Sequence, residues 1–368
     1  MVTMTDVAHA AGVSRATASY ALRGDARIAP DTAERVRQAA QRLHYTANLS
    51  ARSLRSGRNG VIGVAIFELD RPYPSEMGAA MSREAARHGL QAIVQQTSNS
   101  KESEISILRK VTSQLCDGMI FSPGNVNDEE IRALSGGKPM VLLDDISPDP
   151  VFDSVYTACI EGSEAAVRHL IDIGCKHILI VGGTYEDLAD DGKSAGVSIR
   201  RMLGSLQALE EKGMPIDPGM FLPLAPWDSE TARACAHRIV DSGRPVDGVF
   251  GMTDTIALGL IRGFADRGIR VPEDVAVIGF DGISEGECFI PSLSTIRTDL
   301  DDLARKAMGL LLKRIDGDSD DAPVRLTADY ELVVRESTRR QTGHWRIDAP
   351  SLRKTWRNRP LHMRKTLQ

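Results

Sequence analysis

The first 24 residues constrain this chain most, because they hold two short amphipathic stretches on either side of Gly12. Thr5 and Asp6 are expected to begin the first helix and Ser14 the second, since a side-chain oxygen there accepts an otherwise unpaired backbone N–H. The second stretch, residues 15–22, is too polar for the interior of a helical bundle. Two short helices joined by a tight turn are typical of the helix-turn-helix motif, whose second helix enters the DNA major groove. The sequence therefore predicts a DNA-binding unit at this end of the chain.

A third helix is predicted from residue 30 onward. Pro30 suits the first turn of a helix, and the carboxylates of Asp31 and Glu34 suit the positive end of its dipole. The segment that follows, residues 45–55, reads YTANLSARSLR. Together these stretches resemble the DNA-binding headpiece and hinge of the LacI/GalR family of transcriptional repressors. The resemblance continues to ELVVREST at residues 331–338, so it covers roughly nine-tenths of the chain.

Beyond a polar break at residues 56–60, apolar runs alternate with amphipathic helical stretches. This β-α-β order predicts a parallel sheet with helices on both faces. A second set of such elements begins near residue 161, so we expect two lobes with a ligand cleft between them. The expected strands are residues 61–67, 92–94, 118–121, 140–143, 177–181, 248–251 and 275–280, and the expected helices are residues 75–88, 102–115, 161–173, 200–212, 229–242 and 255–267.

The resemblance implies an α/β protein with an all-α helix-turn-helix headpiece and a hinge helix. The headpiece is followed by a two-lobed sensor of doubly wound parallel sheets, similar to periplasmic binding proteins. The chain is expected to cross between the two lobes three times, near residues 158, 290 and 325. The expected domains are residues 1–46 (headpiece), 47–60 (hinge helix and linker), 61–340 (effector binding and dimerisation) and 341–368 (a basic tail, expected to be disordered). Within the sensor, lobe 1 comprises about residues 61–158 and 291–325, and lobe 2 about residues 159–290 and 326–340.

The formal net charge of -5 conceals an uneven distribution of charge along the chain. Residues 1–60 contain 9 Lys and Arg against 4 Asp and Glu, and residues 341–368 contain 7 against 1. Residues 61–340 contain 29 against 45, so this acidic part would repel DNA. Basic residues thus gather in the headpiece, as the neutralisation of DNA phosphates requires. In the basic tail, a second contact with nucleic acid is the alternative to a solvated segment.

Several classes of protein are disfavoured by what the sequence does not contain. The five cysteines form no CxxC pair, so we expect buried, reduced thiols, with no metal site and no cofactor. Residues 2–11 lack the apolar core of a signal peptide, and no apolar run approaches the roughly 20 residues of a membrane span. We therefore expect a cytoplasmic, nucleoid-associated protein.

An enzyme is also disfavoured, and no catalytic residue is predicted. Residues 192–194, GKS, resemble the end of a phosphate-binding P-loop, but Asp187 stands where that motif requires glycine. The chain contains neither a GxSxG nor an HExxH motif. The alternatives that remain are a small-ligand-binding protein and a cytosolic enzyme on the same sensor fold.

The resemblance implies a repressor that binds a pseudo-palindromic operator as a homodimer. Arg15, Ala16 and Tyr20 occupy the positions that face base edges in the matching helix, and Arg15 suits bidentate contact with guanine. Leu54 matches a leucine that enters the minor groove and kinks the duplex. The expected DNA-binding residues are Thr5, Ser14, Arg15, Ala16, Thr17, Ser19, Tyr20, Arg23, Asn48, Ala51, Arg52 and Leu54.

The resemblance also implies an effector in the cleft, a small polar ligand of the sugar or sugar-derivative class. Asp281 follows the strand at 275–280, and the aspartate of this GFD stretch binds two ligand hydroxyls in the family. Arg201 lies three residues before Gly204, where the family has an effector-binding arginine, and Trp227 matches an aromatic residue that stacks on the ligand. Thr253 departs from the asparagine of many relatives. The expected effector-binding residues are Asp70, Tyr73, Ser75, Asp145, Arg201, Trp227, Thr253 and Asp281.

Overall fold

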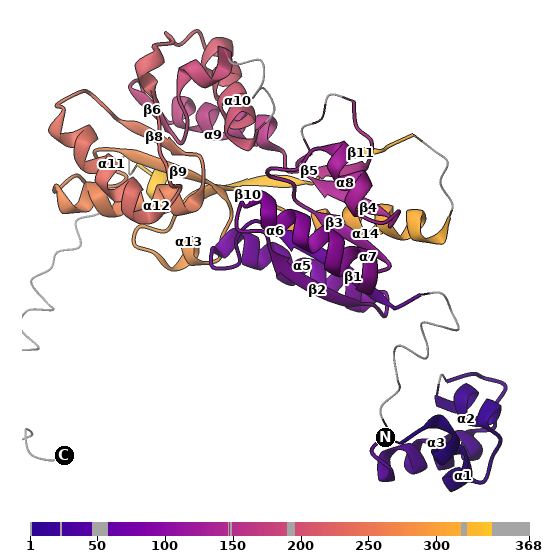
Figure 1. The fold of residues 1–368 in the computed structure, drawn as a ribbon. Coiled ribbons are helices and arrows are strands. Elements are labelled where there is room, and N and C mark those ends of the chain that lie inside the picture. Colours follow the sequence, from indigo (N-terminus) through magenta and orange to yellow (C-terminus); the bar gives the residue numbers. More distant parts are fainter. Residues whose placement is uncertain are drawn as a thin grey trace, which may run out of the picture.

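The computed structural model describes residues 2–22, 24–45, 58–145, 147, 149–189, 196–317 and 322–340. The basic tail, the GKS triplet at 192–194 and most of the expected hinge helix lie outside these ranges. The described chain forms a three-helix headpiece and two units that each contain one sheet (Figure 1).

The headpiece consists of α1 (Met4–Ala11), α2 (Arg15–Leu22) and α3 (Pro30–Arg42). Its core is built mostly of small side chains, which let three short helices approach closely. Ser14 caps α2 as predicted, because its hydroxyl accepts a hydrogen bond from the Thr17 N–H at 3.0 Å. The prediction for α1 was wrong, since Thr3 and not Thr5 is its N-cap. The Thr3 hydroxyl accepts from the Asp6 N–H, and the Asp6 carboxylate accepts from the Thr3 N–H in return.

The first sheet unit, lobe 1, contains six parallel strands in the order β11-β5-β4-β3-β1-β2. The second predicted helix of this unit is interrupted by a π-helical turn at Ile107–Thr112. The strands are β1 (Val61–Ile66), β2 (Gln91–Gln96), β3 (Gly118–Phe121), β4 (Met140–Leu143), β5 (Asp153–Tyr156) and β11 (Arg325–Thr327). The helices are α5 (Pro72–Arg87), α6 (Lys101–Ser106), α7 (Ser113–Leu115), α8 (Asp128–Leu134) and α14 (Leu300–Asp316).

The second sheet unit, lobe 2, has the strand order β12-β10-β9-β8-β6-β7, with β12 antiparallel to β10. Its 3₁₀ turns are Tyr185–Ala189, Pro218–Met220 and Glu336–Thr338. The strands are β6 (Ile178–Val181), β7 (Phe221–Leu222), β8 (Gly248–Gly251), β9 (Ala276–Asp281), β10 (Ser294–Thr298) and β12 (Tyr330–Val333). The helices are α9 (Cys159–Asp172), α10 (Val197–Glu211), α11 (Ser229–Asp241), α12 (Asp254–Asp266) and α13 (Glu285–Cys288).

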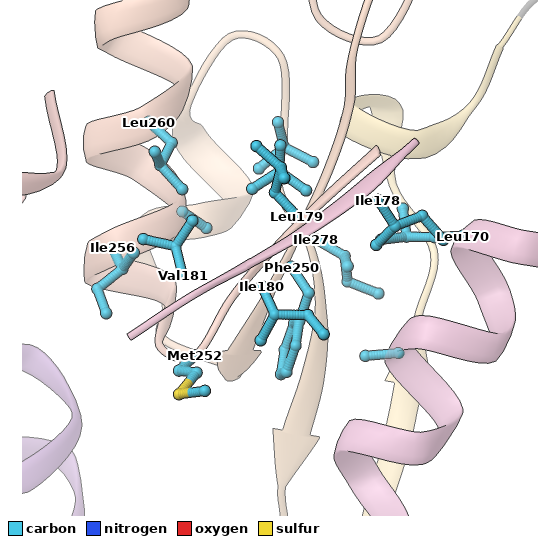
Figure 2. Close-up of a cluster of buried hydrophobic side chains, with 14 of the residues drawn as sticks. Leu170, Ile178, Leu179, Ile180, Val181, Phe250, Met252, Ile256, Leu260 and Ile278 are labelled. Atoms are coloured by element: carbon cyan, nitrogen blue, oxygen red, sulfur yellow. The ribbon is translucent and has the colours of Figure 1, made fainter. Parts of the chain in front are cut away.

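The largest apolar core lies on both faces of the second sheet (Figure 2). Successive side chains of β6 point to opposite faces, so Val181 lies toward Ile256 of α12 while Ile178 lies toward Leu170 of α9. Strands covered on both faces read as continuous apolar runs, which is why the sequence predicted them. The exposed thiol of Cys288, at the end of the short helix α13, corrects the expectation that all five thiols are buried.

The chain crosses between the two units three times: between β5 and α9, between β10 and α14, and between β11 and β12. The second crossing therefore follows Thr298 and does not lie near residue 290. The reason is that β10 pairs with β9 of the second sheet before the chain leaves it. The crossing segments place the carboxyl ends of β9 and β10 beside the N-terminal end of α14.

The contact between α9 and α10 depends on Gly204, because a Cβ there would overlap the Ile160 carbonyl. We predict that Gly204→Ala lowers the free energy of unfolding by about 1–3 kcal/mol, since the helices must separate. Gly309→Ala is the matched control in α14, where a Cβ would meet no atom of the described residues within 4 Å. Helix propensity there predicts a gain of about 0.5–1 kcal/mol. Urea unfolding measures both, and equal losses in the two variants would contradict this account of Gly204.

Candidate functional site

One face of α2 is exposed. Arg15, Ala16 and Tyr20 are exposed, whereas Ala18 and Ala21 are buried against the other helices of the headpiece. Small buried residues thus bring α2 close to α1 and α3 and leave the polar face outward. The neighbours Thr17 and Ser19 are half-buried.

Sequence reasoning missed one basic side chain beside this face. The Arg27 guanidinium lies 5.0 Å from the centre of the Tyr20 ring and pairs with Asp25 at 2.7 Å. Its guanidinium is exposed although it is paired with Asp25. Thr5 is exposed on α1, and the expected DNA-binding residues Arg23, Asn48, Ala51, Arg52 and Leu54 lie outside the described residues.

The second candidate site centres on a buried ion pair in lobe 2. Arg201 of α10 and Asp281 at the end of β9 are only 3% and 6% exposed, and Arg201 Nη2 lies 3.0 Å from Asp281 Oδ1. The guanidinium also donates to the Met252 carbonyl, and its centre lies 3.8 Å from the Phe280 ring centroid. A buried charge pair is stable only when such additional contacts compensate for the loss of water.

Asp281 is held in a backbone conformation that L-residues rarely adopt. Its φ is 118°, a value that typically costs on the order of 1–3 kcal/mol. The neighbouring loop is fixed by Asp254, whose carboxylate accepts hydrogen bonds from Gly282 N at 2.7 Å, Ile283 N at 2.9 Å and Thr295 Oγ1 at 2.6 Å. Asp254 therefore positions Asp281 while being fully buried itself.

Sequence reasoning missed this role of Asp254. The available signal was an aspartate at the first position of a helix that begins shortly after the buried strand β8. Burial, together with the charge of Asp281, raises the pKa of Asp254 well above 3.8.

Tyr73 brings lobe 1 to this ion pair. It belongs to the first turn of α5, yet its ring packs against the apolar core of lobe 2. Its hydroxyl is buried and has no hydrogen-bond partner among the residues that the structure describes. Burial and the nearby carboxylates of Asp144 and Asp281 raise its pKa above 10, so the phenol stays a neutral donor. A buried donor without a partner indicates a place for a polar ligand atom.

Two further polar contacts join the lobes around this point. Ser284, which follows β9, donates to Glu76 of α5 from its hydroxyl at 2.7 Å and from its N–H at 3.1 Å. Arg200 Nη1 lies 4.0 Å from Asp144 Oδ1, at the end of β4. Polar groups of both lobes thus meet around the ion pair.

A cavity of about 460 Å³ lies beside Asp281, within the range of roughly 300–1,000 Å³ typical of small-molecule sites. Thr298 contributes to its wall, and in the described chain the buried Thr298 hydroxyl makes no hydrogen bond. Thr298 could not be predicted from the sequence, because a threonine on a strand carries no functional signal. The lining residues are Glu76, Arg83, Asp281, Gly282, Arg297, Thr298, Asp299, Leu300, Asp301, Asp329, Tyr330 and Glu331.

Most of the other expected effector-binding residues form hydrogen bonds with groups outside the Arg201–Asp281 pair. Trp227 is half-buried and its indole N–H donates to the Gly182 carbonyl at 3.0 Å. Asp145 is buried and accepts from the Ser147 N–H at 3.0 Å, whereas Asp70 is exposed. The hydroxyls of Ser75 and Thr253 bond to backbone groups of their own segments; Ser75 lies within 2.7 Å of the Leu69 and Arg71 carbonyls, and Thr253 caps α12.

The charge state of Asp281 depends on pH in the neutral range. Burial raises its pKa to about 6, although the Arg201 guanidinium acts in the opposite direction. The pKa of an aspartate in an unfolded chain is about 3.9, so the folded state binds this proton more tightly. The resulting stability is fully present below about pH 4 and is lost as the pH rises through about 6.

We predict that Arg201→Met destabilises the fold by about 3–5 kcal/mol at pH 8, because an uncompensated carboxylate stays buried. At pH 5 the loss should be smaller, since Asp281 then takes up a proton. Arg267→Met is the matched control, because Arg267 forms a bidentate pair with Asp241 at the surface; its loss should be about 1 kcal/mol or less. Urea unfolding at both pH values measures this, and a loss for Arg201→Met that is equal at pH 5 and pH 8 would contradict it.

Two family models match separate parts of the chain. "Bacterial regulatory proteins, lacI family" matches residues 3–48, and "Periplasmic binding protein-like domain" matches residues 167–338. The first match covers the three helices of the headpiece, and the second covers most of lobe 2, both crossings around α14 and α14 itself.

Individual relatives match nearly over their whole length. The HTH-type transcriptional repressor PurR of Pasteurella multocida is 28% identical over 92% of this chain and 99% of its own length. A putative LacI-family transcriptional regulator from Sanguibacter keddieii is 34% identical, with a TM-score of 0.68 over 77% of this chain and 99% of that one. A LacI-family regulator from Enterococcus faecium, solved with bound ribose, is 26% identical, with a TM-score of 0.64 over 76% of this chain and 98% of that one.

The described residues contain neither a membrane-spanning helix nor a cluster of metal ligands. No helix there combines the length and the apolar character needed to cross a bilayer. No group of three or more His, Cys, Asp or Glu side chains there is arranged to hold a metal ion.

Proposed function

The chain belongs to the LacI family of bacterial regulatory proteins, and from this membership we propose that its interlobe cleft binds a sugar-like effector that controls the binding of operator DNA. The protein is a DNA-binding transcriptional regulator of the repressor type, and regulators of this family bind operator DNA as dimers with small-molecule effectors.

The relatives are DNA-binding regulators and not enzymes. We therefore assign the cleft to ligand binding rather than to catalysis, and we place the protein in the cytoplasm at the nucleoid, where an operator is accessible.

For DNA, we assign base reading to the exposed face of α2. Arg15 stands at its first turn, where a planar guanidinium suits bidentate hydrogen bonds to guanine. Thr17 and Ser19, set back toward the core, suit phosphate oxygens, which fix the register of the helix in the groove. Arg27, beside Tyr20, adds a further cation for the phosphates.

For the effector, the observation that carries the assignment is the fixed, buried Arg201–Asp281 pair beside the unpartnered hydroxyl of Tyr73. A carboxylate accepts two hydroxyl hydrogens, a guanidinium donates to ring or hydroxyl oxygens, and a phenol donates once more. Neither Arg201 nor Tyr73 lines the cavity beside Asp281, so the ligand class rests on the hydroxyl-binding groups of the ion pair and of Tyr73. The ribose in the Enterococcus faecium relative agrees with this class.

Such a ligand can control DNA binding because its partners belong to both lobes. Tyr73 belongs to lobe 1, whereas Arg201 and Asp281 belong to lobe 2, so the ligand binds one arrangement of the lobes better than another. An effector shifts an equilibrium only through such a difference in affinity. Lobe 1 carries the segment that leads to the headpiece, so its position relative to lobe 2 affects the DNA-binding unit.

We predict that Asp281→Ala abolishes the response of operator binding to a sugar ligand while leaving ligand-free operator affinity almost unchanged, since α2 belongs to a separate helical unit. The ligand is the best stabiliser of the wild type in a thermal-shift panel that includes ribose and cellobiose. Fluorescence-anisotropy titration of a selected operator, with and without that ligand, measures the response.

Asp241→Ala, which breaks a surface pair of the same lobe, is the matched control and should keep the full response. Asp281→Asn, which preserves the shape of the side chain, serves if the alanine variant does not fold. A response of wild-type size in either Asp281 variant would place the effector elsewhere.

A further inference from the structure

The chain enters lobe 1 through a carboxylate clamp at the start of β1. Asp117, just before β3, accepts hydrogen bonds from Asn59 N with Oδ1 and from Gly60 N with Oδ2, both at 2.7 Å. The Asp117 N–H donates in turn to the Val61 carbonyl at 2.8 Å. The Asp117 side chain is only 9% exposed, so these charge-assisted bonds are shielded from water. The backbone of residues 59–61 is therefore fixed to the first sheet.

The preceding residue is held by a different element. Arg58 Nη1 pairs with Asp316 at 2.7 Å, and its Nη2 donates to the Ile315 carbonyl at 2.9 Å. Both partners lie at the C-terminal end of α14, where the helix dipole favours a cation. Asp117, just before β3, and the end of α14 thus hold four consecutive residues of the entering chain, residues 58–61.

A similar carboxylate clamp occurs in lobe 2, but the arginine there, Arg340, donates to the backbone carbonyl of the clamping aspartate itself. Asp247 precedes Gly248 at the start of β8, as Asp117 precedes Gly118 at the start of β3. Its carboxylate accepts hydrogen bonds from Lys176 N at 2.9–3.0 Å and from His177 N at 2.8 Å, just before β6. In lobe 2 the clamped segment follows α9 of the same lobe, whereas in lobe 1 it follows the linker from the headpiece. Only the clamp of lobe 1 therefore lies next to the segment that leads to the DNA-binding headpiece.

We propose that Asp117 and Arg58 form an anchor that fixes where the DNA-binding linker leaves lobe 1, and so sets the spacing at which the two headpieces of a dimer meet their half-sites. Each linker residue released from the anchor adds up to about 3.3–3.6 Å of free chain. A longer tether lowers the effective concentration of the second headpiece once the first is bound. Asp117 and Arg58 are thus positioning residues for operator recognition. The proposal rests on the dimeric operator binding of the family and not on the effector site.

The test compares Asp117→Asn and Arg58→Gln with Asp247→Asn. In Asp117→Asn, an amide N–H₂ replaces one acceptor opposite the backbone N–H groups, so the clamp is broken with little change of volume. Asp247→Asn applies the same chemistry to the other lobe and controls for loss of stability. The probes are a palindromic operator selected from random DNA by the wild-type dimer, a single half-site, and the same operator with one extra central base pair.

We expect Asp117→Asn to bind the palindrome at least about fivefold more weakly while half-site affinity changes less than about twofold. Its preference for the correct spacing over the lengthened one should fall at least about threefold, and Arg58→Gln should shift the same ratio in the same direction. Asp247→Asn should lower the melting temperature without changing that ratio. An unchanged spacing preference in Asp117→Asn and Arg58→Gln, or an equal change in Asp247→Asn, would overturn the proposal. Arg58→Gln decides the outcome if Asp117→Asn does not fold.

Discussion

The buried ion pair between Arg201 and Asp281 is the interaction on which the cleft depends. Two charges removed from water are stable together only if the surrounding structure compensates for their desolvation. Here the compensation comes from the Met252 carbonyl, the Phe280 ring and the loop that Asp254 holds. The carboxyl ends of β8 and β9 and the start of α12 are therefore organised around one pair of charges. Its polar groups face lobe 1 through Tyr73, which makes the pair sensitive to the position of that lobe.

Helix α14 connects this region with the entry point of the linker. Its first residues, Leu300 and Asp301, line the cavity beside Asp281, and its last residue, Asp316, pairs with Arg58. Its N-terminal part is tied to the third crossing, because Asp302 accepts from the Asp329 N–H at 2.9 Å and Lys306 pairs with the Asp329 carboxylate at 3.0 Å. A helix of 17 residues is about 25 Å long, so one rigid element spans lobe 1 from cleft to linker.

Much of this architecture could be predicted from the sequence, and the failures have physical reasons. Strands such as β3 and β8 are covered on both faces, so their apolar runs are unmistakable. The strands β5, β7, β10, β11 and β12 were missed, because β7 has only two residues and the others carry charged residues such as Asp153 and Glu331. Asp153 is nevertheless buried, since it forms a bidentate pair with Arg314, which lies 161 residues away in the sequence. A partner so distant leaves no local pattern.

The same limit applies to the cleft. The sequence suggested Arg201 and Asp281 through their place in family motifs, and the structure brings them together. The role of Asp254 could not be predicted, because its partners are mainly backbone N–H groups of residues 282 and 283. The place of Thr298 in the cavity wall likewise depends on the pairing of β10 with β9, which no local sequence pattern indicates.

The most direct test is a crystal structure of the sensor bound to the sugar that stabilises it most in a thermal-shift panel. The account predicts that ligand hydroxyls contact the Asp281 carboxylate, with the Arg201 guanidinium and the Tyr73 hydroxyl within hydrogen-bond distance of the same molecule. A ligand bound outside the interlobe cleft, with the Arg201–Asp281 pair untouched, would contradict the central claim.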